Sequence, residues 1–455
     1  MKVLKFGGTS VGTVQSLRNV KNIVDSLDEP AVVVVSALGG LTDKLIATAR
    51  MASEGDPDFK TNMREMSERH FEIIEEMVPS DLRANVIEVV GSLLSELEDI
   101  YKGLALIRDL PEKALNRIVS FGERMSSVIV ANLLDNAVHK DSLEFIKTEK
   151  WFGRDIASRQ LTDSLIRDAF NMPLERTVVA GGFISRDKDT NEITNLGRGG
   201  SDYTAALIAA ALEADTLEIW TDVDGFMTAD PRIIRDAMVI DRMSFIESME
   251  LCSFGAKVIY PPTIYPVFHK NIPIRILNTH NPSAPGTFIT DGNENLPDAV
   301  RGVSSVKKTC MVSVSGNLAS NVAQINSRSY NAMARNGISI FLVAQPNADV
   351  AFSMALSESD ADRAADILRE EFAPEIQTGE VTDVSIERNL SIIAVVRESI
   401  KDIKGLGPRL VNTLQREGIS VKAVSDGASE TTIAIMTSDS ETDRSLCLIH
   451  TACFG

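Results

Sequence analysis

Glycine-rich segments that follow short apolar runs are the residues of this sequence best suited to chemistry. Residues 197–202 read Gly-Arg-Gly-Gly-Ser-Asp and precede an apolar stretch with helical character. Backbone N–H groups of such a loop, together with the N-terminus of the following helix, can bind an anion. Arg198 adds a guanidinium whose planar donors fit a carboxylate or a phosphate. In the alternative interpretation, Ser201 and Asp202 only cap the helix.

A second loop of this kind is KFGGTS, residues 5–10. Lys5 lies on an apolar run that predicts a strand, and Gly7 and Gly8 precede a predicted helix. The ammonium and the loop N–H groups could therefore reach the same phosphate oxygens. Taken alone the motif is weak, because a glycine turn is usually only a turn.

Other charged residues are predicted in turns and loops. FGERMSS is expected to place Glu123 and Arg124 at a turn before an apolar helix, although helix starts often carry charge for electrostatic reasons alone. TDVDGFMTADPR, residues 221–232, follows a buried strand and could cover a nucleotide or bind Mg²⁺, but it lacks the final Glu of an EF-hand. Lys257 is expected on a loop within FGAKVIYPPT.

The elements that must position these residues alternate between strand and helix. Residues 51–135 are predicted to be mainly helical, and the predicted strands are Val3–Phe6, Ala31–Val35, Leu143–Ile146, Thr177–Ala180 and Leu217–Trp220. The run of branched residues at 31–35 has no polar alternation, which is typical of a strand buried on both faces in a parallel sheet. The pattern predicts an α/β fold, whose ligands bind beyond the carboxyl ends of the strands.

The C-terminal part contains an internal repeat. Prolines concentrate in residues 261–297, which places a domain boundary near residues 280–300. Beyond it two units each read as β-α-β-β-α-β, but the second lacks its last strand. Because the run Val300–Val306 is spare, we expect it to complete the second sheet, with the first unit inserted into the second. The expected domains are residues 1–285, a linker at 286–299, a first repeat at 308–388, and a second repeat at 300–307 plus 389–455.

Composition excludes several classes of protein. The chain has 46 Lys and Arg against 64 Asp and Glu, a formal net charge of −18, which argues against nucleic acid and anionic membranes as partners. No run approaches the ~18 apolar residues of a membrane span, and the first residues do not resemble a signal peptide. The four cysteines and five histidines lack metal-ligand spacing. A cytoplasmic protein is therefore expected, because few cysteines fit a reducing compartment.

The motifs KFGGTSV, FGERMS, GRGGSDYTAAL, WTDVDG–TADPR and FGAKVIYPPT occur in the order and spacing of aspartate kinases, a branch of the amino-acid kinase superfamily, and this resemblance covers essentially the whole chain. The repeats look like the two ACT domains of that family, which have a ferredoxin-like fold. The resemblance implies transfer of the ATP γ-phosphoryl group to the β-carboxylate of L-aspartate, with Mg²⁺, as the first step toward lysine, threonine and methionine. It also implies feedback by an amino acid and a homodimer or larger assembly through the ACT domains.

The resemblance also implies roles for individual residues. Lys5 would stabilise the transferring phosphoryl group, and Asp202 would organise this lysine and the glycine loop. Arg198 would bind the α-carboxylate of aspartate and Glu123 its amino group, within a substrate site made of Ser36, Thr42, Glu123, Arg198, Gly199, Gly200 and Ser201. ATP would contact Lys5, Gly7, Gly8, Thr221, Asp222, Met227, Arg232 and Lys257, with Met227 standing where relatives often have Tyr.

In the regulatory part, the resemblance points to an effector site at Ile325, Asn326 and Gln345. Gln345 matches a Gln of threonine-sensitive relatives, whereas Asp426 stands at the corresponding place in the second repeat, so threonine is favoured over lysine. The match is closest to the kinase half of bifunctional aspartokinase–homoserine dehydrogenases, and the chain is expected to be a fragment of a longer polypeptide. The alternatives are a kinase for another amino acid or a carbamate, and a catalytically silent amino-acid-sensing regulator.

Overall fold

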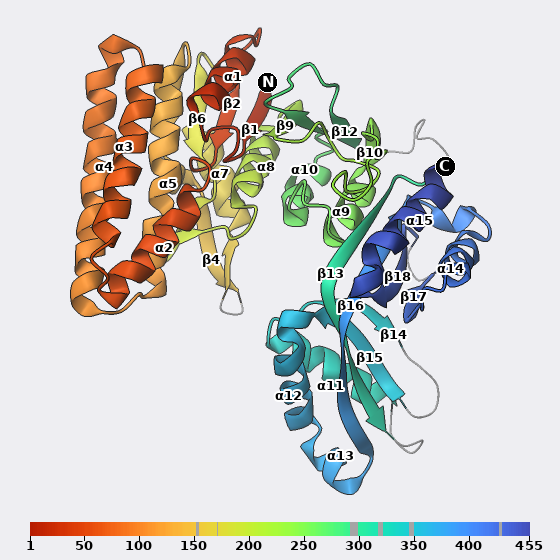
Figure 1. Ribbon diagram of the computed structural model, residues 1–455. Coiled ribbons are helices and arrows are strands. Elements are labelled where there is room, and N and C mark those ends of the chain that lie inside the picture. The colour runs from red at the N-terminus through yellow and green to blue at the C-terminus, as the bar shows by residue number, and fades with distance from the viewer. Residues whose placement is uncertain (152–153, 171, 292–298, 317–321, 345–349, 427–429) are drawn as a thin grey trace. The chain divides into compact units, whose positions relative to one another are not determined.

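The structure is a computed structural model, and it describes residues 1–151, 154–170, 172–291, 299–316, 322–344, 350–426 and 430–455 (Figure 1). The chain divides into two compact units. The first unit comprises Met1–Phe226, Val239–Phe245 and Val258–Glu294, and the second comprises Met227–Met238, Ile246–Lys257 and Asn295–Gly455. Two segments from the expected catalytic region thus pack with the C-terminal repeats.

An eight-stranded sheet forms the centre of the first unit. Its strands, in spatial order, are β10 (Arg242–Ser244), β12 (Thr287–Thr290), β11 (Ile274–Asn278), β9 (Thr216–Thr221), β1 (Lys2–Phe6), β2 (Val32–Val35), β6 (Thr177–Gly181) and β3 (Ala137–Lys140). Neighbouring strands run parallel except β11 and β12. All four valines of β2 are buried, which confirms the prediction of a strand covered on both faces.

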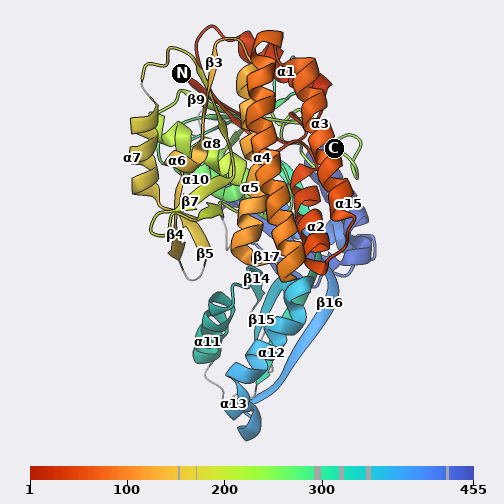
Figure 2. The same cartoon turned by 90° about the vertical axis from the view of Figure 1, so that its left-hand side faces the viewer.

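Helices occupy most of the rest of this unit. They are α1 (Val14–Asp25), α2 (Leu41–Glu54), α3 (Phe59–Met77), α4 (Ser80–Ile107), α5 (Glu112–Leu133), α6 (Ser142–Phe145), α7 (Arg159–Ala169), α8 (Gly200–Leu212), the 3₁₀ turn Pro261–Thr263 and α10 (Ile264–Phe268). The long helices α3, α4 and α5 lie side by side in both views (Figures 1 and 2). Their buried stripes join the core that also covers β1 and β2, so the predicted helical region is confirmed.

Two local predictions in this unit are wrong. Residues 143–146 form the end of helix α6 and the residue after it rather than a strand, because Asp141 accepts a hydrogen bond from the Leu143 N–H and caps a helical turn. Glu123 lies in the middle of α5 rather than at a turn before a helix. Position 122 of this helix requires glycine, because the Cβ of any other residue would lie only 2.6 Å from the Ala37 Cβ.

A smaller four-stranded sheet lies in the same unit. Its strands are β5 (Arg154–Ala157), β4 (Lys147–Trp151), β7 (Ile184–Asp187) and β8 (Ile193–Asn195). The β7–β8 hairpin connects β6 to the glycine loop at residues 197–199, and α8 begins directly after this loop. The hairpin therefore delivers that loop to the N-terminus of α8.

The second unit is built on a six-stranded antiparallel sheet. In spatial order its strands are β14 (Ile340–Ala344), β15 (Val350–Ser357), β13 (Gly302–Gly316), β16 (Val381–Val396), β18 (Thr432–Ser438) and β17 (Ala423–Ser425). Its helices are α9 (Phe245–Ser253), shared with the first unit at its start, α11 (Val322–Arg335), α12 (Ala361–Glu371), α13 (Ala373–Thr378), α14 (Leu406–Arg416) and α15 (Thr442–Phe454), with 3₁₀ turns at 358–360, 400–402 and 439–441.

Strands β13 and β16 run through both repeats. Residues 302–306 of β13 pair with residues 392–396 of β16, whereas residues 309–316 pair with the strands of the first repeat. The segment before the first repeat therefore extends the sheet of the second repeat, as an inserted first repeat requires. Each repeat keeps four strands, but the two sheets expected from the sequence are one sheet with two shared strands.

The segment Met227–Met238 belongs to this second unit because of its apolar residues. Ala229 and Ile234 are buried in the same core as Leu410, Ile435 and Leu446 of the second repeat. The Thr228 carbonyl also accepts a hydrogen bond from the Val303 N–H on β13. Burial of these side chains explains why the segment packs with the repeats.

Candidate active site

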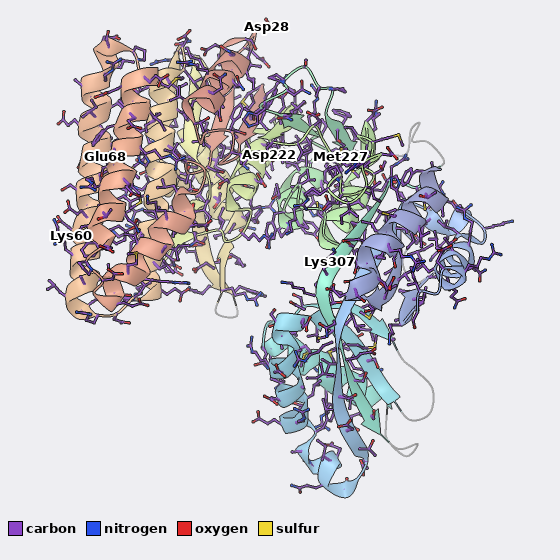
Figure 3. All side chains as sticks on the ribbon, viewed as in Figure 1. Asp28, Lys60, Glu68, Asp222, Met227 and Lys307 are labelled. Atoms are coloured by element: carbon purple, nitrogen blue, oxygen red, sulfur yellow. The ribbon has the colours of Figure 1, made fainter. Side chains whose placement is uncertain are left out.

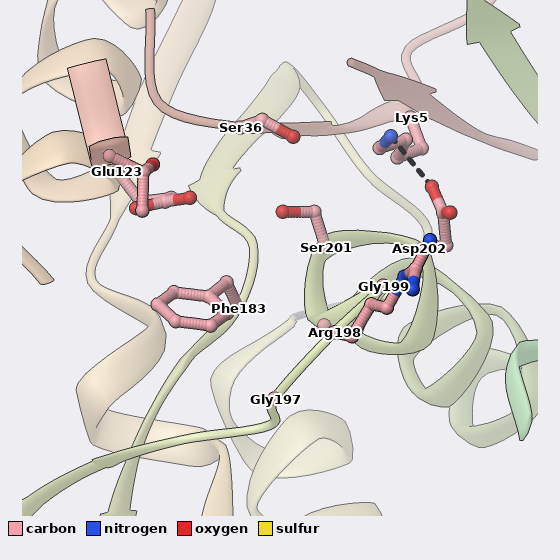
Figure 4. A pocket seen from close by; sticks show the side chains of 11 residues that line it. Lys5, Ser36, Glu123, Phe183, Gly197, Arg198, Gly199, Ser201 and Asp202 are labelled. Atoms are coloured by element: carbon pink, nitrogen blue, oxygen red, sulfur yellow. Dashed lines mark ion pairs between the residues drawn. The ribbon is translucent and has the colours of Figure 1, made fainter. Parts of the chain in front are cut away.

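A pocket of about 270 Å³ opens in the first unit among the ends of β1, β2 and β6 and the start of α8 (Figure 4). It is lined by Lys5, Ser36, Thr42, Glu123, Phe183, Gly197, Arg198, Gly199, Gly200, Ser201 and Asp202. The structure thus brings together both residues expected to be catalytic, Lys5 and Asp202, and all seven expected to bind the acceptor. Phe183 and Gly197 were not anticipated.

Lys5 and Asp202 form an ion pair on one side of the pocket. The Lys5 Nζ lies 2.6 Å from the Asp202 Oδ1, and the two side chains are 11% and 12% exposed. Lys5 is held on β1 between its neighbours β2 and β9, and Asp202 is in the first turn of α8. This arrangement fixes the Lys5 ammonium close to the N-terminus of α8. Both the ammonium and the helix N-terminus stabilise the negative charge of a bound ligand.

Glu123 lies on the other side of the pocket, with Ser36 and Ser201 between it and the ion pair (Figure 4). The side chain comes from α5 and the residue is only 4% exposed. Its Oε2 has no hydrogen-bond partner among the described residues. Burial raises the pKa of the Glu123 carboxyl to about 8, an effect that a backbone N–H of Ala37 and the charge of Lys5 only partly offset.

The glycine loop before α8 is shaped by close packing. Gly199 has a φ of +68°, and a Cβ there would lie 2.2 Å from the Cβ of Tyr260. A Cβ on Gly200 would lie 2.9 Å from the Phe183 ring. These two positions therefore need glycine for space, and Gly199 also for its left-handed backbone.

Phe183 is the pocket residue that sequence reasoning missed. It follows β6 and has a φ of +67°, a conformation that costs free energy for a residue with a side chain. The Thr204 hydroxyl accepts a hydrogen bond of 3.0 Å from the Phe183 N–H, which stabilises this backbone. The Gly-Gly pair before it, residues 181–182, is the one sequence signal that indicated a close approach there.

The residues expected at ATP divide between the two units. Gly7 and Gly8 belong to the loop after β1, and Thr221 ends β9. Asp222, labelled in Figure 3, begins the next loop. The Thr221 hydroxyl donates to Asp222 at 3.2 Å. These four lie in the first unit but do not line the pocket.

Met227, Arg232 and Lys257 lie in the second unit. Arg232 is 82% exposed and its guanidinium lies 2.7 Å from the Asp230 carboxylate. Lys257 is exposed on the loop after α9, as the sequence predicts for a loop residue. These three positions remain predictions as nucleotide contacts.

Two of the three expected effector residues, Ile325 and Asn326, lie on α11. Ile325 is buried in the core of the first repeat. The Asn326 Oδ1 is buried and has no hydrogen-bond partner among the described residues. Gln345 lies outside the described residues. The two described residues therefore offer one buried amide oxygen next to an apolar core.

Within the described ranges, no group of three His, Cys, Asp or Glu residues could hold a metal ion. No helix in the described part of the chain is both long and apolar enough to cross a membrane.

Comparison with known proteins identifies the family of this chain. The sequence profile of the amino acid kinase family matches residues 1–278, and that of an ACT domain matches residues 393–453. The bifunctional aspartokinase/homoserine dehydrogenase of Haemophilus influenzae is 32% identical over 468 residues, covering 100% of this chain and 57% of the relative. The chain therefore spans little more than half the length of that relative.

Solved structures resemble the chain over its whole length. E. coli aspartokinase III in complex with aspartate and ADP (R-state) matches with a TM-score of 0.85 at 28% identity, covering 100% of both chains. The same enzyme in complex with lysine and aspartate (T-state) matches with a TM-score of 0.76 at 27% identity, again covering 100% of both. Because the family profile spans more than half of the sequence, this chain belongs to the amino acid kinase family.

Proposed function

We propose that the protein is an aspartate kinase, which transfers the γ-phosphoryl group of ATP to the β-carboxylate of L-aspartate and forms 4-phospho-L-aspartate. The observation that carries this proposal is the pocket, where the Lys5–Asp202 pair, Arg198 and the buried Glu123 meet. Their charges complement a phosphoryl group, an α-carboxylate and an ammonium. The similarity to an enzyme crystallised with aspartate and ADP supports the substrate pair.

The mechanism follows from the charge of the two reactants. The attacking β-carboxylate has an ordinary pKa of ~3.9 and is ionised at pH 7, so it needs no general base. The obstacle is the approach of two anions. Lys5 would neutralise charge that develops on the transferring phosphoryl group, and the backbone N–H groups near Gly7 and Gly8 would orient its oxygens. Catalysis would then consist of positioning and charge neutralisation.

Acceptor binding would depend on residues from other elements. Arg198 would pair with the α-carboxylate through its planar donors, and Glu123 would accept the α-ammonium. Ser201 and Thr42 would supply hydroxyl groups along the pocket. Because these groups come from α2, α5 and the start of α8, the acceptor carboxylate would be oriented independently of the nucleotide.

Mg²⁺ is proposed as the ion that accompanies ATP. It prefers oxygen ligands and usually enters such sites with the phosphates and one or two carboxylates. Asp202, the carboxylate beside Lys5 at the phosphoryl side of the pocket, fits that donor set. Bound Mg²⁺ would supply further neutralisation of phosphate charge.

We also propose that the second unit binds a feedback amino acid, threonine or lysine, and that two or more copies associate through the ACT repeats. The unpartnered amide oxygen of Asn326 supports an amino-acid site on α11. The relative crystallised with lysine and aspartate supports an amino-acid effector. The domain boundaries expected from the sequence form part of this proposal.

Coupled ADP release tests the proposed function. Purified protein with Mg²⁺ and ATP should release ADP on addition of L-aspartate, and much more slowly with L-glutamate as the control acceptor. Turnover with glutamate but not with aspartate would show that the protein is a kinase for another amino acid and not an aspartate kinase. A folded protein that binds ATP but shows no acceptor-dependent turnover would instead favour an amino-acid-sensing regulator.

A further inference from the structure

Arg69 lies on α3 and does not line the pocket, yet its guanidinium reaches both glycine loops beside the pocket. Its Nη2 donates one hydrogen bond to the Gly12 carbonyl at 2.7 Å and another to the Gly39 carbonyl at 3.0 Å. Gly12 belongs to the loop after β1, residues 7–13, and Gly39 to the loop after β2, residues 36–40. One nitrogen therefore joins the two loops.

These loops touch each other through backbone atoms. A Cβ on Gly39 would lie 2.9 Å from the Gly8 carbonyl oxygen, and a Cβ on Gly12 would lie 3.3 Å from the Gly39 backbone nitrogen. The loops thus meet at three glycines, which have no side chains to set the spacing between them. A hydrogen-bond donor from outside the loops can set this spacing, and the Arg69 guanidinium lies at the contact between them.

Arg69 donates hydrogen bonds to backbone carbonyls, whereas the other links from α3 to α1 and α2 are ion pairs between side chains. Among the described residues no carboxylate forms an ion pair with Arg69, and the side chain is half-buried. The two carbonyls are therefore its observed partners, and hydrogen bonds from a charged donor are stronger than neutral ones. Arg18–Glu76 and Lys44–Glu65 also connect α3 to α1 and α2, but these pairs are largely exposed and should contribute little.

We propose that Arg69 is a positioning residue for phosphoryl transfer, which holds the loops at 7–13 and 36–40 at a fixed separation. The first loop carries Gly7 and Gly8, and the second begins with Ser36, which lines the pocket. Arg69 would thereby keep the phosphate-binding backbone aligned with the acceptor site. This inference rests on the proposed kinase function.

The energetics of the reaction predict which kinetic constants depend on Arg69. Misplacing reacting groups by about 1 Å can cost about 10²-fold in rate. Loss of the guanidinium should therefore lower kcat by about 10–100-fold and weaken ATP binding, because the first loop would face the phosphates. The KM for aspartate should change less than kcat, because Arg198 and Glu123, which carry the charged contacts to aspartate, lie outside both loops, and the second loop contributes only Ser36 to the acceptor site.

The test compares Arg69→Met with Arg18→Met, a matched change on α1 that breaks the Arg18–Glu76 pair without reaching the loops. Steady-state ADP release gives kcat and both KM values, and thermal melting by circular dichroism reports the folded fraction. We expect the loss of kcat only in Arg69→Met, with both variants fully folded at the assay temperature. Wild-type kcat in folded Arg69→Met, or losses that follow only the unfolded fraction, would overturn the proposal.

Chemical rescue gives an independent readout. Arg69→Ala leaves a space shaped for a guanidinium, so millimolar guanidinium chloride should restore part of its kcat while wild-type and Arg18→Met activities stay unchanged. A folded Arg69→Ala that does not respond would contradict the positioning role. Should Arg69→Ala fail to fold, Arg69→Met retains the apolar stem and decides the question alone.

The outcomes also separate this inference from the proposed function. If the wild-type protein releases no ADP with aspartate, the proposed function fails. Arg69 is then judged by calorimetric titration with Mg²⁺-ATP, since the first loop would face the phosphates of ATP whatever the acceptor. Weaker ATP binding in Arg69→Met than in Arg18→Met would support the positioning role, and equal affinities would overturn it.

Discussion

At the scale of single residues, the chemistry of this protein depends on charges held in a small, partly buried space. Lys5 and Asp202 are paired at 2.6 Å, and Glu123 stands across the pocket without a hydrogen-bond partner for its Oε2 among the described residues. The ammonium of Lys5 would bind a phosphoryl group, and the carboxylate of Glu123 would bind a substrate ammonium. The pocket is therefore prepared for ligands of opposite charge at its two sides.

Removing either member of the ion pair should abolish most of the activity. Lys5→Ala and Asp202→Ala should each lower kcat by about 10²–10³-fold, the usual effect of losing one preorganised charge at a developing negative charge. Circular dichroism should show that both variants are folded. Because the two residues act as a unit, the double variant should be little worse than either single one. Near-normal turnover in a folded single variant would refute the assigned roles.

The raised pKa of Glu123 makes a prediction about pH. Below a pH of about 8 the free carboxyl is mostly protonated, and above it the carboxylate is available for an ammonium. The kcat/KM for aspartate, which reports the free enzyme, should therefore rise as the pH increases from about 6.5 through about 8. Glu123→Gln should bind aspartate weakly and show no such rise. An unchanged pH profile in this variant would assign the titration to another group.

At the scale of elements, the glycine loop before α8 sets the position of Arg198. Gly199 and Gly197 both have positive φ, but only a Cβ at 199 would collide with a neighbour, whereas nothing lies within 4 Å of one at 197. Gly199→Ala should therefore raise the KM for aspartate at least about tenfold. Gly197→Ala is the matched control, and it should lower the free energy of unfolding by only the backbone cost of about 1 kcal/mol. Equal kinetic effects would show that packing against Tyr260 is unimportant.

Element by element, the sequence predicted what local patterns encode. The buried strand at 32–35 was predictable from its valines, and the pocket residues on glycine loops from their motifs. The short helix at 142–145 was not, because a four-residue segment with apolar Leu143 and Phe145 on either side of Glu144 fits either helix or strand until the Asp141 cap is seen. Glu123 was misplaced for a related reason, since Gly122 indicates a turn by propensity but fits the helix through close packing with Ala37.

Other features depend on contacts between distant residues. Phe183 reaches the pocket through a strained backbone that Thr204 supports, and the Gly-Gly pair before it indicates a close approach without indicating that the Phe183 side chain enters the pocket. Arg69 lies within the long region that the sequence predicts only as helical, and the fold alone brings it to Gly12 and Gly39. Such residues cannot be found from spacing alone.

At the scale of the whole molecule, the proposed function places catalysis in the first unit and amino-acid sensing in the second. Asn326→Ala on α11 should weaken inhibition by the effector, threonine or lysine, at least about tenfold without changing uninhibited kcat. The substitution removes the buried amide oxygen that would accept a hydrogen bond from the effector. Asn331→Ala, an exposed position on the same helix, is the control. Inhibition of Asn326→Ala equal to that of the wild type would place the effector elsewhere.

Association of copies is a separate prediction at this scale. If the ACT repeats pair between chains, native mass spectrometry should give twice the 49.5 kDa of one chain, or a higher multiple. A single-chain mass at micromolar concentration would exclude assembly as part of regulation.

The most direct test of the central claim is to identify the phosphorylated product. The protein should be incubated with Mg²⁺-ATP, L-aspartate and hydroxylamine, and the product analysed by mass spectrometry, because hydroxylamine converts an acyl phosphate into a stable hydroxamate. We predict aspartate β-hydroxamate in amounts equal to the ADP released, and none with Lys5→Ala. ADP release without hydroxamate, or hydroxamate formed equally by the variant, would contradict the proposed phosphoryl transfer.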